Sequence, residues 1–203
     1  MKRVVLEGKD FNRLIAATKS FIGKDDRRPI YKYIKIDVRR ATGPLDNGRV
    51  TAAACDGHRL SVERASAVFT VDETFSCYIP PCARVPQKAF VEIELKDNDV
   101  LIRVEDKIFG CRQPKSKEEF VNYEKFFEEG VKFRVAFQPE YLEKALAAAK
   151  ASVGNVRAPV VLEFRDYRSP VFFKTGQNRE NLKMVLPVRI EDGVEYEEAE
   201  SAD

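Results

Sequence analysis

The chain has 203 residues, of which 33% are charged and 44% are hydrophobic, and its formal net charge is only +2. This composition is typical of a well-packed soluble protein and excludes a polycation of the histone kind, so any nucleic-acid contact must come from local segregation of charge. No apolar stretch approaches the roughly 20 residues of a membrane-spanning helix, and the first apolar run is too short for a secretory signal. We therefore expect a cytoplasmic protein.

The cysteines predict buried, reduced thiols. Four are present, mostly in apolar, strand-like contexts: Cys55, Cys77, Cys82 and Cys111. Their spacing matches no zinc pattern, and a chain whose single histidine is His58 cannot complete such a ligand set. We therefore expect neither a bound metal nor a cofactor.

The first part of the chain predicts a strand, a helix and three further strands. A short strand over Val4–Leu6 leads to a helix from Phe11 to about Ile22, with Asp10 as its N-cap and Gly23 at its end. The strands expected after this helix are Tyr31–Val38, Arg49–Arg64 and Phe75–Ile79.

The middle part predicts a meander without a helix. Pro80, Pro81 and Pro86 block a helix after the preceding strand. Alternating apolar residues then predict three strands, Phe90–Leu95, Val100–Val104 and Ile108–Cys111. A polar connection over 114–130 follows, and we expect four aromatic side chains to pin it to the surface: Phe120, Tyr123, Phe126 and Phe127.

The last part repeats the layout of the first. A strand over Lys132–Phe137 precedes a helix from Pro139 to about Ser152. The apolar stripe of this helix is made by Tyr141, Leu142, Ala145, Leu146 and Ala149. The strands expected after it are Pro159–Arg165, Pro170–Lys174 and Leu182–Ile190.

Together these elements predict an α+β fold of mostly antiparallel sheets with two helices. We expect one domain over 1–127, a second βαβββ unit over 128–192 and an acidic, disordered tail over 193–203. An alternative arrangement, in which the first and last parts pair into one compact domain, stays open at this point.

Two short segments carry a specific resemblance. Residues 52–60 read Ala-Ala-Ala-Cys-Asp-Gly-His-Arg-Leu, and residues 184–190 read Met-Val-Leu-Pro-Val-Arg-Ile. The first is similar to Ala-Thr-Asp-Gly-His-Arg-Leu-Ala, and the second resembles Val-Met-Pro-Met-Arg-Leu. Both are signature segments of the bacterial sliding clamp, the processivity subunit of DNA polymerase III. The resemblance covers about residues 1–190 and implies a shortened DNA-clamp fold, in which a domain that lacks its second helix is followed by a half-domain.

The resemblance implies a hydrophobic pocket that captures short peptide motifs of DNA polymerase and other replication or repair proteins. Carried over position by position, this pocket takes Tyr31, Ile34, Gly57, His58, Arg59, Leu60, Met184, Leu186, Pro187, Val188 and Arg189. Cys55 stands where the family has threonine, and Leu186 and Val188 replace methionines, so a narrower or different peptide is expected because flexible thioethers are lost. Ordinary roles remain the alternative for these residues, namely a turn, core packing and solvated arginines.

The resemblance also implies non-specific contact of the helices with the backbone of double-stranded DNA. The candidate cations are Arg13, Lys19, Lys24, Lys144 and Lys150. Glu140 and Glu143 oppose them on the second helix. A comparable ring needs several copies of this chain as a homo-oligomer. The alternative is a clamp-derived binding or regulatory module that does not encircle DNA.

Catalysis is the remaining alternative. His58 lies beside Asp56 and close to Cys55, which are residue types used in acid–base and nucleophilic chemistry. Neighbouring side chains of a strand point to opposite faces, however, and the sequence has no second histidine and no glycine-rich phosphate loop. We therefore expect no enzymatic activity.

Overall fold

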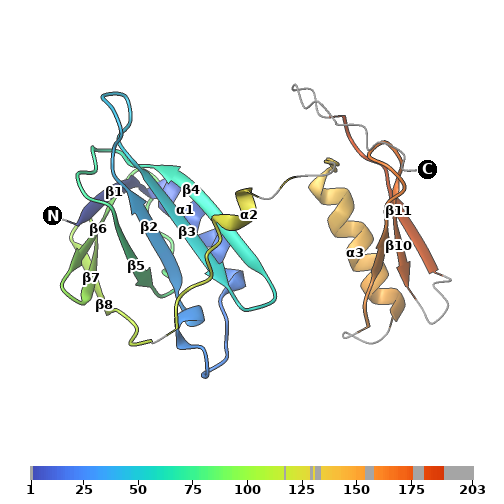
Figure 1. Cartoon of the computed structure of the whole chain (residues 1–203), viewed down its shortest axis with the longest axis horizontal. Coiled ribbons are helices and arrows are strands. Elements are labelled where there is room, and N and C mark those ends of the chain that lie inside the picture. Colours follow the sequence, from blue (N-terminus) through green and yellow to red (C-terminus); the bar gives the residue numbers. More distant parts are fainter. Residues whose placement is uncertain are drawn as a thin grey trace. The chain divides into compact units, whose positions relative to one another are not determined.

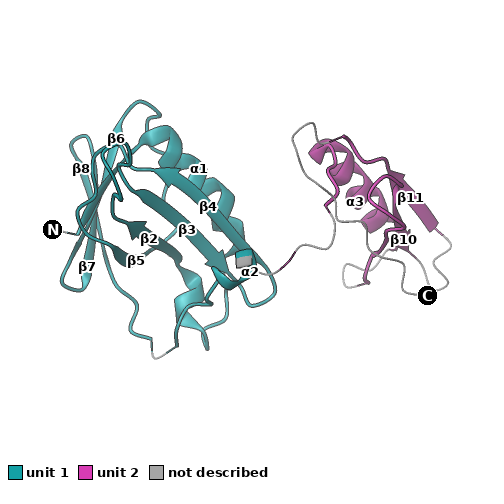
Figure 2. Ribbon diagram, turned by 45° about the horizontal axis from the view of Figure 1, so that its top comes forward, with its two compact units in different colours: residues 1–127 teal, residues 128–203 magenta. Residues whose placement is uncertain are grey.

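The computed structural model describes residues 2–116, 118–128, 130, 134–153, 158–175 and 181–189. The chain divides into two compact units, unit 1 over 1–127 and unit 2 over 128–203, which are teal and magenta in Figure 2. Each unit has its own sheets and its own core. The predicted tail over 193–203, Ile190 and the start of the strand predicted over Lys132–Phe137 lie outside the described residues.

Unit 1 contains one long helix and eight strands among its described residues. In chain order they are β1 (Arg3–Glu7), α1 (Gly8–Thr18), β2 (Ile34–Arg39), β3 (Arg49–Cys55), β4 (Leu60–Ser66), β5 (Phe75–Ile79), β6 (Phe90–Lys96), β7 (Asp99–Val104) and β8 (Lys107–Arg112). Two 3₁₀ turns, Lys19–Phe21 and Pro29–Lys32, follow α1, and the short helix α2 (Lys125–Glu128) lies at the boundary of the unit.

The strands of unit 1 form two antiparallel sheets. Strand β1 belongs to the sheet of β6, β7 and β8, and strand β5 belongs to the sheet of β2, β3 and β4. The orders are β4-β3-β2-β5 and β1-β6-β7-β8 (Figure 1). Because β1 pairs with β6 and β5 pairs with β2, the first and middle parts of the sequence build one unit together. The predicted meander β6-β7-β8 is confirmed, as is the absence of a helix between β5 and β6. The single strand predicted over Arg49–Arg64 was wrong, because a turn at 56–59 divides it into β3 and β4.

Helix α1 packs its apolar stripe against the sheets of unit 1. Phe11, Leu14 and Ile15 are buried, and the helix lies against β3 and β4 (Figure 2). Burial alternates along β2, so Ile34 and Ile36 face the core while the residues between them face outward. This alternation is the reason that the sheet has one apolar and one mixed face.

The predicted start of α1 was wrong. The helix begins at Gly8, so Asp10 lies inside its first turn and is not the N-cap. The first amide groups are satisfied by backbone carbonyls: Gly8 N donates to Ala89 O over 2.7 Å, and Lys9 N donates to Gln87 O over 3.0 Å. Because the connection before β6 supplies these acceptors, the helix needs no side-chain cap.

The outer face of β4-β3-β2-β5 holds part of the connection to unit 2. Phe120 and Tyr123 are buried there, and the hydroxyl of Tyr123 donates to Asp37, which also accepts from Ser76. These two aromatic anchors are confirmed. Phe126 is exposed, so its predicted role was wrong, whereas the partly exposed ring of Phe127 contacts the Arg64 guanidinium of β4 at 4.3 Å.

Unit 2 is a small helix-on-sheet layer. Its elements are α3 (Pro139–Val153), β9 (Val161–Glu163), β10 (Val171–Thr175) and β11 (Asn181–Val185). The strands form an antiparallel sheet in the order β11-β10-β9, and α3 covers one face of it (Figure 1). The buried core consists of Ala145, Ala149, Val171, Phe173 and Val185.

Two expectations for unit 2 fail for physical reasons. Tyr141 and Leu146 of the predicted stripe are exposed, because the narrow sheet covers only the side of α3 that carries the buried alanines. The last strand ends at Val185, since Pro187 has no N–H to continue the ladder. Val188 then forms an isolated bridge with Ala136. No helix in the described ranges is long and apolar enough to cross a bilayer.

Candidate functional site

The turn between β3 and β4 is held by one carboxylate. Asp56 Oδ1 accepts from the backbone N–H groups of His58 and Arg59 at 2.9 and 2.8 Å, and its Oδ2 accepts from the Arg59 guanidinium at 2.6 Å. Gly57 has a φ of +90°, the left-handed region in which glycine is favoured. These hydrogen bonds, led by the one from His58 N, lower the pKa of Asp56 to about 2.

We expect the turn to lose its order only in strong acid. A depressed folded pKa means that the stabilisation is complete above the ordinary value of 3.8 and is lost as the pH falls through about 2. In an NMR titration, the amide shifts of His58 and Arg59 should therefore move with a midpoint near 2. Asp56→Asn should abolish this titration, and a midpoint near 4 in the wild type contradicts the assignment.

Three of the unit 1 candidates, Tyr31, Gly57 and His58, line a polar hollow of about 450 Å³. It is lined by Gly23, Asp25, Arg27, Arg28, Tyr31, Asp56, Gly57, His58 and Glu118. Tyr31 is half-buried, with its ring at 5.5 Å from that of Phe120, and burial raises the pKa of its phenol. His58 is exposed. The charged lining suits the polar flank of a ligand and not an apolar anchor.

Three predicted pocket residues of unit 1 have other roles. Ile34 was assigned wrongly, because it is 0% exposed and its side chain faces the core on the opposite side of β2 from Tyr31's cluster. Leu60 is half-buried in the cluster that covers the outer face of the sheet. Arg59 pairs with the Asp56 carboxylate, donates to Ser20 O over 3.3 Å and lies over an aromatic ring, so its charge is already engaged.

In unit 2 the candidate residues form an exposed apolar surface. Leu186, Met184 and Tyr141 have exposed fractions of 60%, 55% and 55%. Together they border a hollow of about 520 Å³, which is lined by Tyr141, Lys144, Ala145, Lys183, Met184, Val185, Leu186, Pro187 and Val188. Contiguous exposed apolar side chains of this kind mark interaction sites more often than single ones do.

A second hollow, of about 600 Å³, lies in unit 2 along the same segment. Its lining residues are Arg134, Val135, Ala136, Tyr167, Arg168, Pro187, Val188 and Arg189. The hydrogen bond from Val188 N to Ala136 O, at 2.8 Å, fixes the segment between the two hollows. Sequence reasoning missed Arg134, Tyr141, Tyr167 and Arg168. Only Tyr141 had a signal, as an aromatic residue at the edge of a helical stripe.

The predicted site residues therefore belong to two different units. Tyr31 and the turn 57–60 lie in unit 1, and residues 184–189 lie in unit 2. That the two groups share one pocket stays a prediction.

Solved structures of DNA polymerase clamps share this architecture. The sliding clamp of Bacillus subtilis matches with a TM-score of 0.76 and 16% identity, over 94% of this chain and 50% of that one. The beta subunit of Streptococcus pyogenes matches with a TM-score of 0.75 and 18% identity, over 93% of this chain and 51% of that one. A putative DNA polymerase III beta subunit of Eubacterium rectale matches with a TM-score of 0.75 and 13% identity, over 92% and 50%.

The chain has the sliding-clamp fold. It spans about half the length of the clamp chains that it matches. No protein-family model matches the sequence, and neither does any curated protein. The resemblance predicted from the motifs at 52–60 and 184–190 is confirmed at the level of the fold.

The candidate DNA-binding cations differ in whether their charge is already paired with a carboxylate of the chain. Arg13 pairs with Glu63 and with Asp10, and it also donates to a backbone carbonyl of β4, so its charge is neutralised. Lys144 pairs with Glu140 at 2.6 Å. The remaining candidates, Lys19, Lys24 and Lys150, are exposed and make no ion pair with any residue that the structure describes.

The residues considered for catalysis are used for structure. Asp56 binds the backbone of His58 and not its ring, and the buried Cys55 Sγ accepts from Gly57 N at 3.3 Å. Within the described ranges, no group of three or more His, Cys, Asp or Glu residues is placed to hold a metal ion.

Proposed function

We propose that this chain is a clamp-fold protein that captures short hydrophobic peptide motifs of DNA polymerase or of other replication or repair proteins. The observation that supports the proposal is the set of exposed apolar side chains of Met184, Leu186 and Val188, on a segment that borders two hollows of unit 2. The similar structures include DNA polymerase sliding clamps, and one of these, from Pseudomonas aeruginosa, is bound to griselimycin.

The segment offers apolar anchoring and a charged rim. Burial of a leucine or phenylalanine anchor against Leu186 contributes roughly 1.5 to 3 kcal/mol. Two anchors therefore contribute about 3 to 6 kcal/mol, and micromolar binding, at about 8 kcal/mol net, also requires the polar contacts of the rim. Arg134 and Arg189 line the adjoining hollow, where their guanidinium groups can bind carbonyl or carboxylate oxygens of the peptide.

A matched pair of variants tests this assignment. We expect Leu186→Asp to weaken binding of a fluorescent leucine- and phenylalanine-containing clamp-binding peptide at least about tenfold, which corresponds to one lost apolar contact. Leu182→Asp is the control, because Leu182 lies on β11 just before this segment, is similarly exposed at 54% and lines neither hollow. Equal affinities of wild type and Leu186→Asp in fluorescence anisotropy rule out the site. His58→Ala tests the unit 1 residues separately.

A clamp-derived module that does not encircle DNA is the second candidate. It is favoured by the neutralised charges of Arg13 and Lys144. Size-exclusion chromatography with light scattering separates the two candidates. A ring-sized homo-oligomer retained on closed circular DNA supports encirclement, whereas a monomer at micromolar concentration supports the module.

A further inference from the structure

Unit 1 consists of two similar halves, and only one of them has a helix. In the first half, α1 connects β1 to β2 and lies over the sheet formed by β2, β3 and β4. In the second half, the residues between β5 and β6 run without a helix from Pro80 to Ala89. The inward residues of β6 and β7 are nevertheless buried in the core of the unit, and the exposed part of this sheet is its edge strand β8.

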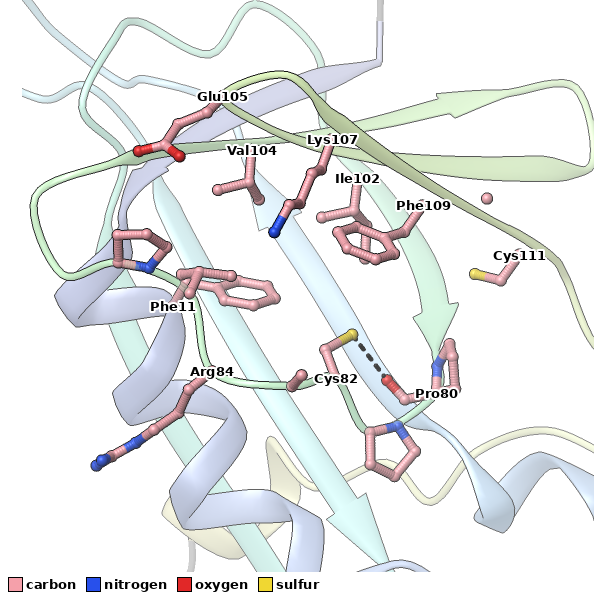
Figure 3. Close-up of a pocket in the computed structure, with 15 residues that line it drawn as sticks. Phe11, Pro80, Cys82, Arg84, Ile102, Val104, Glu105, Lys107, Phe109 and Cys111 are labelled. Atoms are coloured by element: carbon pink, nitrogen blue, oxygen red, sulfur yellow. Dashed lines mark hydrogen bonds between the residues drawn. The ribbon is translucent and has the colours of Figure 1, made fainter.

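A groove of about 440 Å³ lies between the helix-free segment 80–86 and the strands β7 and β8. It is lined by Phe11, Pro80, Pro81, Cys82, Ala83, Arg84, Val85, Pro86, Ile102, Val104, Glu105, Lys107, Phe109, Gly110 and Cys111. In Figure 3 the rings of Phe11 and Phe109 lie on opposite sides of the opening. Phe109 pairs in register with Ile102, yet Phe109 is 55% exposed and Ile102 only 4%, because β8 is the edge strand of the sheet.

The wall opposite the sheet is fixed in place. The Asn12 side chain of α1 binds Val85 twice, donating to Val85 O over 2.8 Å and accepting from Val85 N over 3.0 Å. Burial raises the pKa of the Cys82 thiol to about 11, so this side chain is a neutral thiol at neutral pH. The groove is thus preformed, which lowers the entropic cost of binding a ligand there.

The rim of the groove carries an excess of positive charge. Arg84 and Lys107 are exposed, and neither makes an ion pair with a residue in the part of the chain that the structure describes. The Lys107 side chain reaches over the opening, and Arg84 extends outward beside α1 (Figure 3). Glu105 is the single acidic residue of the lining. Cations at the edge of an apolar groove complement a ligand whose apolar face is flanked by acidic groups.

We propose that this groove binds an amphipathic, acidic helix of a partner protein, which takes the place that α1 occupies in the first half. The helical form follows from the counterpart, where α1 presents Phe11, Leu14 and Ile15 from one face. An incoming helix with apolar residues at the same spacing presents such a stripe to the exposed ring of Phe109, and its acidic flanks meet Arg84 and Lys107. This proposal is independent of peptide capture by unit 2.

The test uses the full chain and a fluorescent synthetic peptide with a leucine and phenylalanine stripe and glutamates on both flanks. A peptide with lysines in place of the glutamates is its control. We expect the acidic peptide to bind at least tenfold more tightly than the basic one. The double variant Arg84→Glu, Lys107→Glu should weaken the acidic peptide at least tenfold, and added salt should weaken it in the wild type.

Matched variants separate the groove from the rest of the surface. Phe109→Ser should weaken the acidic peptide at least tenfold, since exposed aromatic anchors dominate such contacts. Ile108→Ser and Lys88→Glu should change its affinity less than twofold, because both residues are exposed neighbours that do not line the groove. Unchanged affinity in Leu186→Asp shows that the binding is distinct from capture by unit 2.

Several outcomes overturn the proposal. They are equal binding of the acidic and basic peptides, no binding of either, and affinities that the groove variants leave unchanged while circular dichroism shows them folded. A further one is a dimer of the free chain that Phe109→Ser dissociates, because the occupant is then a second copy of the chain and not an acidic helix.

Discussion

Replacing Phe173 by alanine is expected to destabilise unit 2 by about 3–5 kcal/mol, the usual cost of removing a buried phenylalanine side chain. Phe173 is 1% exposed and is the largest side chain in a core that otherwise consists of Ala145, Ala149, Val171 and Val185. Such a loss approaches the whole stability of a domain this small. We therefore expect the amides of β10 and α3 to lose their protection from hydrogen exchange.

The neighbouring residue provides the control. Phe172 lies on the other face of the same strand, is half-buried and lies under the Arg165 guanidinium, at 5.1 Å. Phe172→Ala should therefore cost much less than Phe173→Ala in urea unfolding followed by NMR. Amides of β6 and β7 serve as the internal reference, because the core of unit 1 is made of its own residues. Equal costs for the two variants contradict the assignment of the core.

Replacing Gly8 by alanine is expected to destabilise unit 1 by at least about 2 kcal/mol, within the range of overpacked sites. A Cβ atom at this position would lie 2.0 Å from Pro86 O and 3.1 Å from Ala89 O. Both atoms belong to backbone, and Gly8 N donates to Ala89 O over 2.7 Å, so relief of the clash breaks the bond that caps α1.

Gly43 gives the matched control for this substitution. A Cβ atom there would meet nothing within 4 Å, and its φ is not in the left-handed region. Gly43→Ala should leave the free energy of unfolding within about 0.5 kcal/mol of the wild type, as surface substitutions do. Urea unfolding of both variants checks the prediction, and a Gly8→Ala protein as stable as Gly43→Ala contradicts it.

The elements that could be predicted are those whose signal is local. Alternation from Phe90 to Val104 gives β6 and β7 within one or two residues, and the periodicity after Pro139 gives α3. The start of α1 could not be predicted, because its cap is supplied by carbonyls that lie about eighty residues away in sequence. Only the folded chain brings these carbonyls to Gly8.

The part of the candidate site that could be predicted is also the part whose signal is local in the sequence. The segment 184–188 carries its apolar character in its own sequence, and the structure places it at the surface. Ile34 was misplaced because Tyr31 precedes the strand in a 3₁₀ turn, which changes the side to which each side chain points. The three prolines predicted the missing helix, but they gave no sign that its absence leaves a groove beside Phe109.

The exchange of β1 and β5 between the two sheets has a consequence for biosynthesis. Leu6 pairs with Val91, so the first strand leaves the ribosome long before its partner is made. Such distant pairing is slow because the loop must close before any contact stabilises it. The nascent chain therefore carries an unmatched apolar strand during much of its translation, and the charged ends of that strand, Arg3 and Glu7, discourage association with other chains in the meantime.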